Sequence, residues 1–224
     1  MDRCLHAHLF ALHAGPYGPA QNVRLQKTPK GGRDVVSSET FKSLIITISG
    51  LPGSGTTTAA ERLSEATGME VLSAGEVFRN MAEKKDMSLE EFSELAEEDD
   101  EIDKELDERM VERASPGMIL EGRLTGHLLK MSDKEAYKVW IQAPLKTRVE
   151  RIAERESYGD LEELKERVLK RERSEEKRYR EYYDIDLFDT SFYDEVIDSV
   201  KNRPEEIVDK IIVGVKDEMR VRDR

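Results

Sequence analysis

The stretch from Leu44 to Gly68 most constrains how this chain can fold. It reads LIITIS, then GLPGSGTTT, then AAERLSEATG. The run LIITIS is short, continuously apolar and rich in β-branched residues, which is typical of a strand buried on both faces of a parallel sheet. The segment TTTAAERLSEAT favours a helix, and Gly68 follows it as a stop signal. A strand, a glycine-rich turn and a helix in this order predict the first unit of an α/β fold.

The glycine-rich turn itself nearly matches the phosphate-binding pattern G-x-x-x-x-G-K-[ST]. Gly50 and Gly55 have the required spacing, and Thr57 stands where a metal-binding hydroxyl belongs, but Thr56 replaces the lysine. Backbone N–H groups at a helix N-terminus attract phosphate oxygens even without that lysine. The alternative is an ordinary strand-to-helix turn. We predict a nucleotide-binding loop formed by Gly50, Leu51, Pro52, Gly53, Ser54, Gly55, Thr56, Thr57 and Thr58.

Strand and helix patterns alternate along the rest of the chain. Apolar runs predict strands at 70–75, 118–124, 137–143 and 194–199. Helical segments are expected at 76–85, 88–99, 100–114, 144–156, 161–183 and 203–215. This order predicts an α/β three-layer sandwich with a central parallel five-stranded sheet. The helices within 76–114 form an insertion between the second and third strands, and His127 is expected at a strand edge.

Composition limits the partners of the chain. No run approaches the ~20 apolar residues that a membrane span needs. The formal net charge of −12 over 224 residues argues against a general binder of nucleic acids. The single cysteine, Cys4, excludes a disulfide framework and indicates a reducing, cytoplasmic location. We expect a monomer that binds small molecules and has no membrane or nucleic-acid partner.

The first 43 residues differ from the rest of the chain. They are basic, contain breaker-rich runs such as TPKGG and show no sustained period, so we predict a flexible extension. The folded domain is expected to span 44–218, with a tail at 219–224. The stretch CLHAHLFALHAG is a poor secretory signal because three histidines interrupt it. A plainer hypothesis is that translation starts further downstream, which peptides from residues 1–33 in the native protein would refute.

Polar residues follow two of the predicted strands. Ser73 ends the second strand and Arg79 lies one turn into the next helix, a pair that would suit a phosphorylated acceptor, although Arg79 alone also fits a surface arginine. Glu121 ends the strand MIL at the sheet edge that faces the ligand crevice. Its carboxylate could hold magnesium, or it could pair with a nearby arginine. Arg123 follows next to Gly122, which permits close backbone approach.

The long helix 161–183 carries a stripe of polar side chains. Arg171, Glu175, Arg178 and Tyr182 are spaced so that, at ~100° per residue, all four fall on one narrow face. Such a charged helix could simply be solvated and laced with ion pairs. However, two arginines, a carboxylate and a tyrosine make a poor core face and a good binding face, because arginines clamp phosphate oxygens and a carboxylate accepts from an amine.

Together these motifs resemble the nucleoside monophosphate kinases, and among them the archaeal type of cytidylate kinase. The resemblance covers residues 44–213 and rests on ITISGLPGSGTTT, LSAGEVFR, LEGRLTG and RERSEEKRYREYYDID. Family members of this type include some with threonine at the lysine position, as at Thr56. In the bacterial cytidylate kinases an aspartate follows the arginine of the GR pair, where this chain has Leu124, and their base-binding insertion is not recognisable here.

The resemblance implies a P-loop NTPase fold with an insertion that binds the nucleoside monophosphate and a short lid at about 155–162. The loop would hold ATP, with Thr57 and Glu121 at the magnesium ion, and CMP or dCMP would be the acceptor. Residues implied to contact the acceptor are Ser73, Arg79, Arg123, Arg171, Glu175 and Arg178. Arginines implied to act on the transferred phosphoryl group are Arg123, Arg151 and Arg155, the last two bordering the lid.

The sequence therefore predicts ATP-dependent phosphorylation of CMP to CDP, with two alternatives. One is a kinase for another acceptor, such as AMP, UMP or a small alcohol; a hydroxyl acceptor would need a base, and the chain offers no dedicated one. The other is a nucleotide-binding protein that lost catalysis with the lysine. The acceptor-site residues argue against it, because a simple binder has no use for them.

Overall fold

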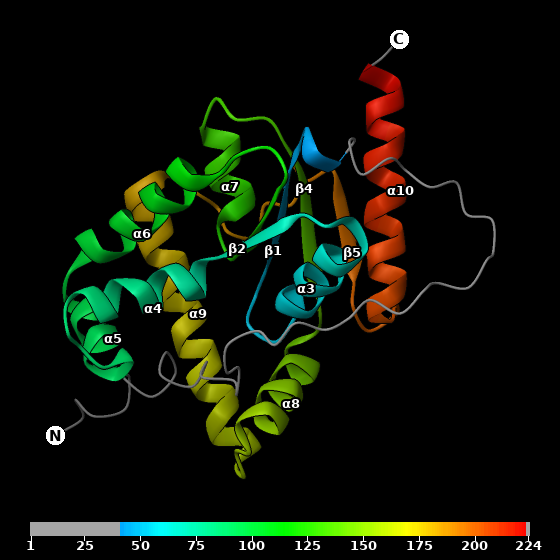
Figure 1. The fold of residues 1–224 in the computed structure, drawn as a ribbon. Helices are drawn as coiled ribbons and strands as arrows, with labels where there is room; N and C mark the ends of the chain where they lie inside the picture. Colours follow the sequence, from blue (N-terminus) through cyan, green and yellow to red (C-terminus); the bar gives the residue numbers. More distant parts are fainter. Residues whose placement is uncertain (1–40, 223–224) are drawn as a thin grey trace, which may run out of the picture.

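The computed structural model describes residues 41–222 and shows a five-stranded parallel sheet (Figure 1). Its strands are β1 (Ile45–Gly50), β2 (Glu70–Ser73), β3 (Met118–Gly122), β4 (Ala136–Gln142) and β5 (Glu195–Asp198). They lie in the order β2-β3-β1-β4-β5, so β1 occupies the centre. Parallel pairing places the carboxyl ends of β1, β2 and β3 together, because Ser73 is in register with Glu121 and Ser49 with Gly122.

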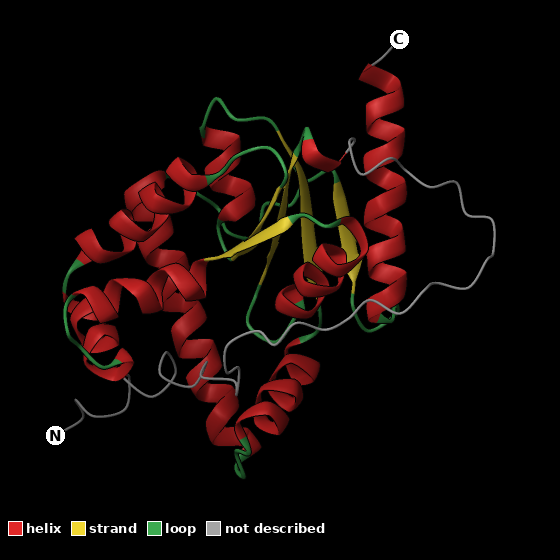
Figure 2. Cartoon of the chain, viewed as in Figure 1, coloured by secondary structure: helices red, strands yellow, loops and turns green. Residues whose placement is uncertain are grey.

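Helices cover both faces of the sheet (Figure 2). Helix α3 (Thr56–Thr67) and α10 (Pro204–Arg222) pack on one face, where Ile46 and Ile48 of β1 meet Leu63 and Ile211. Helix α7 (Thr125–Met131) lies on the other face with α4 (Ala74–Lys84), α5 (Leu89–Glu98) and α6 (Asp100–Arg113) extending the same core. Every residue of β1 is buried, as expected for a central strand with helices on both sides. The predicted three-layer α/β fold is confirmed.

Two consecutive helices after β4 form a hairpin that projects from the sheet (Figure 1). Helix α8 (Leu145–Glu156) and α9 (Leu161–Tyr183) enclose a small core of their own around Ile152 and Leu164. Asp160 caps α9 by accepting hydrogen bonds from the backbone N–H groups of Glu162 and Glu163. The turn of this hairpin lies at residues 157–160.

Several predicted boundaries need correction. The third strand, expected over 118–124, ends at Gly122, and residues 123–124 form the turn after it. His127, expected at a strand edge, lies in the helix Thr125–Met131, where it packs against Phe192. Phe41, assigned to the flexible extension, is buried in the core beside α3 and α10. Helix α10 continues to Arg222 through most of the predicted tail. The rest of the predicted extension, residues 1–40, lies outside the described residues.

The insertion after β2 is made of α4, α5 and α6 (Figure 1). Its first helix begins at Ala74, two residues earlier than the sequence pattern suggested. The capping box predicted at the start of α5 is present, with the Ser88 side chain accepting from the N–H of Glu91 and the Glu91 carboxylate accepting from the N–H of Ser88. Between residues 41 and 222, no helix is both long and apolar enough to cross a membrane.

Candidate active site

The glycine-rich loop connects β1 to α3 and has the backbone geometry of an anion cradle. Gly53 and Gly55 have φ values of 80° and 102°, in the left-handed region that favours glycine. A Cβ at Gly53 would lie 2.6 Å from the carbonyl oxygen of Arg148, so a larger residue would not fit there. Gly55 is the N-cap of α3 and no side chain caps that helix, which leaves its first N–H groups directed at the loop.

Glu121 links the loop to the neighbouring strand ends. Its Oε1 accepts hydrogen bonds from the hydroxyls of Thr56 at 2.7 Å and Thr57 at 3.3 Å. Its Oε2 accepts from the hydroxyl of Ser73 at 2.8 Å. The side chain is buried at the carboxyl end of β3. The arginine pairing considered for Glu121 is not what the described residues show: three hydroxyls hold its carboxylate, one of them at the position of the missing lysine.

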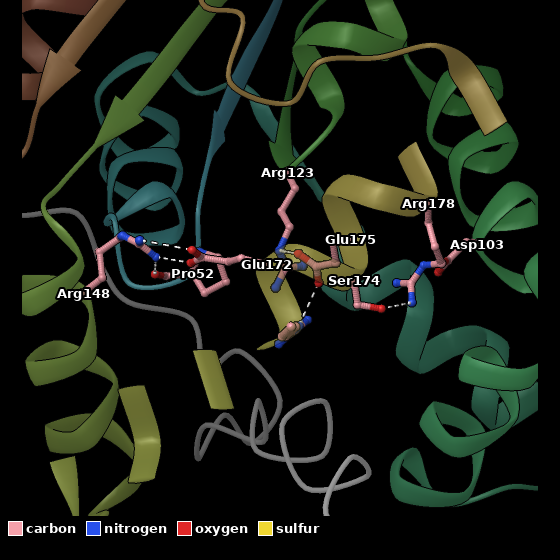
Figure 3. Close-up of polar contacts among 9 residues, drawn as sticks. Pro52, Asp103, Arg123, Arg148, Glu172, Ser174, Glu175 and Arg178 are labelled. Carbon is pink, nitrogen blue, oxygen red and sulfur yellow. Dashed lines mark hydrogen bonds and ion pairs between the residues drawn. The ribbon is translucent and has the colours of Figure 1, made fainter. Parts of the chain in front are cut away.

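Arg123, directly after β3, pairs with α9 (Figure 3). Its Nε lies 2.9 Å from Oε2 of Glu175, and the Nε of Arg171 donates to Oε1 of the same carboxylate at 2.8 Å. Burial alone would raise the pKa of Glu175, but the two guanidinium groups hold it below its usual value. Glu175 is therefore an ionised, buried carboxylate that orients two arginines.

The other end of α9 contacts α6. The Nε of Arg178 lies 3.2 Å from Oδ2 of Asp103, and Tyr183 donates from its hydroxyl to Oδ2 of Asp107 at 3.0 Å. Burial raises the pKa of Asp103 despite the attraction of Arg178, and burial raises the pKa of Asp107 to about 7. Neither aspartate is among the site residues predicted from the sequence. Their signal is helical spacing, because Asp103 and Asp107 share one face of α6 with Met110.

One pocket lies between α4, α6, α9 and the segment after β3. Asp103 and Asp107 line it from α6, Arg178 and Tyr179 from α9, and Arg123 from the turn before α7. Ser73 ends β2 directly before α4, one of the helices that line the pocket. Its hydroxyl donates to Glu121. Arg79 is half-buried on α4, with NH1 near Gly75. The structure thus brings most of the predicted acceptor residues to one place.

Two arginines of α8 donate hydrogen bonds to the backbone carbonyl groups of the loop. Arg148 is buried; it forms an ion pair with Glu172 and donates to the carbonyl of Pro52 at 3.4 Å (Figure 3). Arg151 donates to the carbonyls of Gly53 at 3.3 Å and Ser54 at 3.2 Å, and to the hydroxyl of Ser199 at 2.8 Å. The role of Arg148 as an anchor of the loop follows from the structure, because its contacts with Pro52 and Glu172 join segments far apart in the sequence.

Arg155 and Tyr182 lie outside this network. Arg155 is exposed near the end of α8, where it donates to Glu156 at 2.8 Å. Tyr182 stacks edge-on against Tyr183 and lies under the ammonium group of Lys104. Within residues 41–222, no group of three or more histidine, cysteine, aspartate or glutamate side chains is arranged to hold a metal ion.

A protein-family model described as "Cytidylate kinase-like family" matches residues 45–201. The chain belongs to this family. The cytidylate kinase of Methanopyrus kandleri is 48% identical over 70% of this chain and 85% of its own length. The cytidylate kinase of Methanosarcina barkeri is 46% identical over 76% of this chain and 95% of its own length. Family membership agrees with the resemblance found in the sequence, and the matched region contains every predicted site residue.

Solved structures of other kinases share the fold. A gluconokinase from Sinorhizobium meliloti superposes with a TM-score of 0.53 at 15% identity, covering 82% of this chain and 99% of its own. A shikimate kinase from Acinetobacter baumannii, in complex with shikimate, has a TM-score of 0.50 at 17% identity and covers 78% and 94% of the two chains. At these identities the likeness concerns the fold of this cytidylate kinase-like chain and not its acceptor.

Proposed function

We propose that this protein is a nucleoside monophosphate kinase that transfers the γ-phosphoryl group of ATP to CMP, forming ADP and CDP, and that dCMP is a second acceptor. One observation carries the proposal: a phosphate cradle and an arginine-lined acceptor pocket meet at one sheet edge, where Glu121 touches both Thr56 of the loop and Ser73 of the acceptor side. The names of the archaeal relatives support CMP as the acceptor.

The loop fits the phosphates of ATP. Gly53 and Gly55 have left-handed backbones, a Cβ at Gly53 would collide with Arg148, and no side chain caps α3. These features let backbone N–H groups approach phosphate oxygens closely. Arg148 and Arg151 hold the loop by its carbonyl groups, and Arg151 adds positive charge beneath it. We assign Arg151 to this supporting role.

Magnesium fits beside the loop. The Thr57 hydroxyl and the Glu121 carboxylate are oxygen ligands of the kind that Mg²⁺ prefers, and Mg²⁺ commonly takes its other ligands from phosphates and water. Two protein ligands are enough for such a site, in keeping with the absence of a larger cluster in the described chain. When bound, the ion would neutralise charge on the phosphate oxygens.

The chain's own residues then account for the transfer. The acceptor oxygen belongs to a phosphate that is already ionised near neutral pH, so no general base is needed, and catalysis depends on alignment and charge neutralisation. Arg123, oriented by Glu175, lines the acceptor pocket two residues after Glu121, which contacts the loop, so it is suited to bridge both phosphates. Arg171 and Arg178 bind the acceptor. Arg79 and Arg155 remain candidates that would need to move toward the phosphates.

An acceptor panel tests the proposal. The full chain is incubated with Mg-ATP and each of CMP, dCMP, UMP, AMP, shikimate and gluconate, and ADP release is measured together with the phosphorylated product. CMP should give the highest kcat/KM, followed by dCMP. Phosphorylation of a hydroxyl acceptor alone would contradict the proposal. ADP formation without transfer, or none at all, would favour a nucleotide-binding protein. Monomeric state, cytoplasmic location and absence of nucleic-acid binding stay predictions from composition.

A further inference from the structure

Helix α9 makes an ordered series of contacts that spans the site, and Figure 3 shows those of Glu172, Glu175 and Arg178. The contacts, in chain order along α9, are Glu172 with Arg148, Glu175 with Arg123, Arg178 with Asp103, and Tyr183 with Asp107. The first lies beside the phosphate loop, because Arg148 also bonds Pro52. At 1.5 Å per residue, the distance along the helix from Glu175 to Tyr183 is about 12 Å, which is comparable to a mononucleotide from phosphate to base.

This series gives the acceptor a direction. Its phosphate must lie at the Arg123 end, since the transferred group comes from the neighbouring loop. The sugar and base then extend along α9 toward α6, where Asp103 and Asp107 line the same pocket. Phe78 and Leu106 supply apolar walls of that pocket. The far end of the pocket therefore combines apolar surface with two carboxyl groups.

In each carboxyl group, the contact with α9 is made by one oxygen, Oδ2. Arg178 contacts Oδ2 of Asp103, and Tyr183 donates to Oδ2 of Asp107. Among the residues that the structure describes, Oδ2 of Asp103 is buried without a hydrogen bond although Nε of Arg178 lies 3.2 Å away, and the bond from Tyr183 is the one seen at the Asp107 carboxylate. Burial raises the pKa of both groups, which indicates that the present partners do not replace the water lost on folding. N–H donors of a bound ligand would supply the hydrogen bonds that the two carboxyl groups lack.

We propose that Asp103 and Asp107 form the base-reading end of the acceptor pocket, where they accept hydrogen bonds from the exocyclic amine of cytosine. This inference rests on the proposed function and specifies how that site selects its base. An amine carries two N–H donors, one for each carboxyl group. Uracil has a carbonyl oxygen at the same position, and that oxygen would face two acceptors without a donor, which is costly in a buried site.

Two isosteric variants test the proposal. Asp107→Asn and Asp103→Asn are assayed for kcat/KM with CMP and UMP, with Glu108→Gln as the matched control, since Glu108 is exposed on the same helix and outside this pocket. Each aspartate variant should lower the CMP-to-UMP ratio at least ~10-fold, the scale of one buried hydrogen bond to a charged group. The control should leave the ratio unchanged. The ratio is the informative quantity because a purely structural defect, including a displaced Arg178, would lower kcat/KM for both substrates alike.

An unchanged ratio in both aspartate variants would overturn the inference while the proposed function stands. A wild-type enzyme that phosphorylates no pyrimidine monophosphate would overturn both. If the variants do not fold, the wild-type protein still decides the matter with N4,N4-dimethyl-CMP, which lacks both amine hydrogens. The inference requires this analogue to lose at least ~10-fold in kcat/KM relative to CMP; equal use of the two acceptors would refute base reading at the amine.

Discussion

The hydroxyl of Thr56 donates a 2.7 Å hydrogen bond to Oε1 of Glu121, at the position where a phosphate-binding loop usually has its lysine. The same carboxylate accepts from Thr57 and Ser73, so the loop, β2 and β3 meet at one side chain. In this loop the position of the lysine is thus used to tie the loop to the sheet edge. The positive charges of the site come from α8, α9 and the turn after β3.

Replacing Thr56 with lysine should not raise kcat. An ammonium group at this position would pair with Glu121 and compete for the carboxylate that we assign to magnesium. Steady-state kinetics of Thr56→Lys at several Mg²⁺ concentrations should show an unchanged or lower kcat and a need for more Mg²⁺. Ala66→Lys, at an exposed position on the same helix and outside the predicted loop, is the control. A large gain in kcat would mean that the missing charge has not been replaced.

Arg123 should dominate the chemical step. We expect Arg123→Ala to lower kcat by at least ~100-fold, the scale of losing one preorganised donor to the developing charge. The exposed Arg62, which pairs with Glu205 at 3.0 Å, provides Arg62→Ala as a control with near-normal turnover. Both variants are first compared with the wild type by circular dichroism, because removing Arg123 leaves the buried Glu175 with one pairing partner fewer. Near-normal kcat in a folded Arg123→Ala would refute the assignment.

Breaking the ion pair between Arg148 and Glu172 should lower the free energy of unfolding. Both side chains are nearly buried, so Glu172→Ala leaves an uncompensated guanidinium group beneath the loop. We expect a loss of about 3 kcal/mol in the free energy of unfolding, measured by urea denaturation, and a higher KM for ATP. The exposed pair of Glu150 with Lys146 gives the control, since Glu150→Ala should cost less than about 1 kcal/mol. Equal losses in both variants would contradict the anchoring role of Arg148.

The pKa of Asp107 predicts a specific dependence of stability on pH. Burial raises this pKa from 3.8 to about 7, so the folded chain binds more protons than the unfolded chain between these values. The contribution of Asp107 is therefore favourable at low pH and is lost as the pH rises toward 7. The difference in unfolding free energy between wild type and Asp107→Asn should shift against the wild type from about pH 4 to pH 7 and then level off. A difference independent of pH would show that Asp107 titrates normally.

The sequence by itself determined the fold class and the position of the loop. A continuously apolar strand, glycines at fixed spacing and a following helix leave few arrangements, because only a buried parallel strand and a tight turn satisfy them together. The spacing of Arg171, Glu175 and Arg178 also placed these residues on one face of α9, since helical periodicity depends only on local geometry. No helix was predicted over Thr125–Met131, because seven residues are too few to show a clear helical period.

Only the tertiary structure decided which side chains meet. The partners of Glu121 come from β2 and the loop, 48 to 65 residues away in the chain, and strand register brings them together. Likewise, Asp103 and Asp107 became candidates only when α6 was seen against α9 across one pocket. Local pattern states which face of an element is polar. What that face contacts depends on how elements distant in the sequence pack together. The chemistry of this site depends on those contacts.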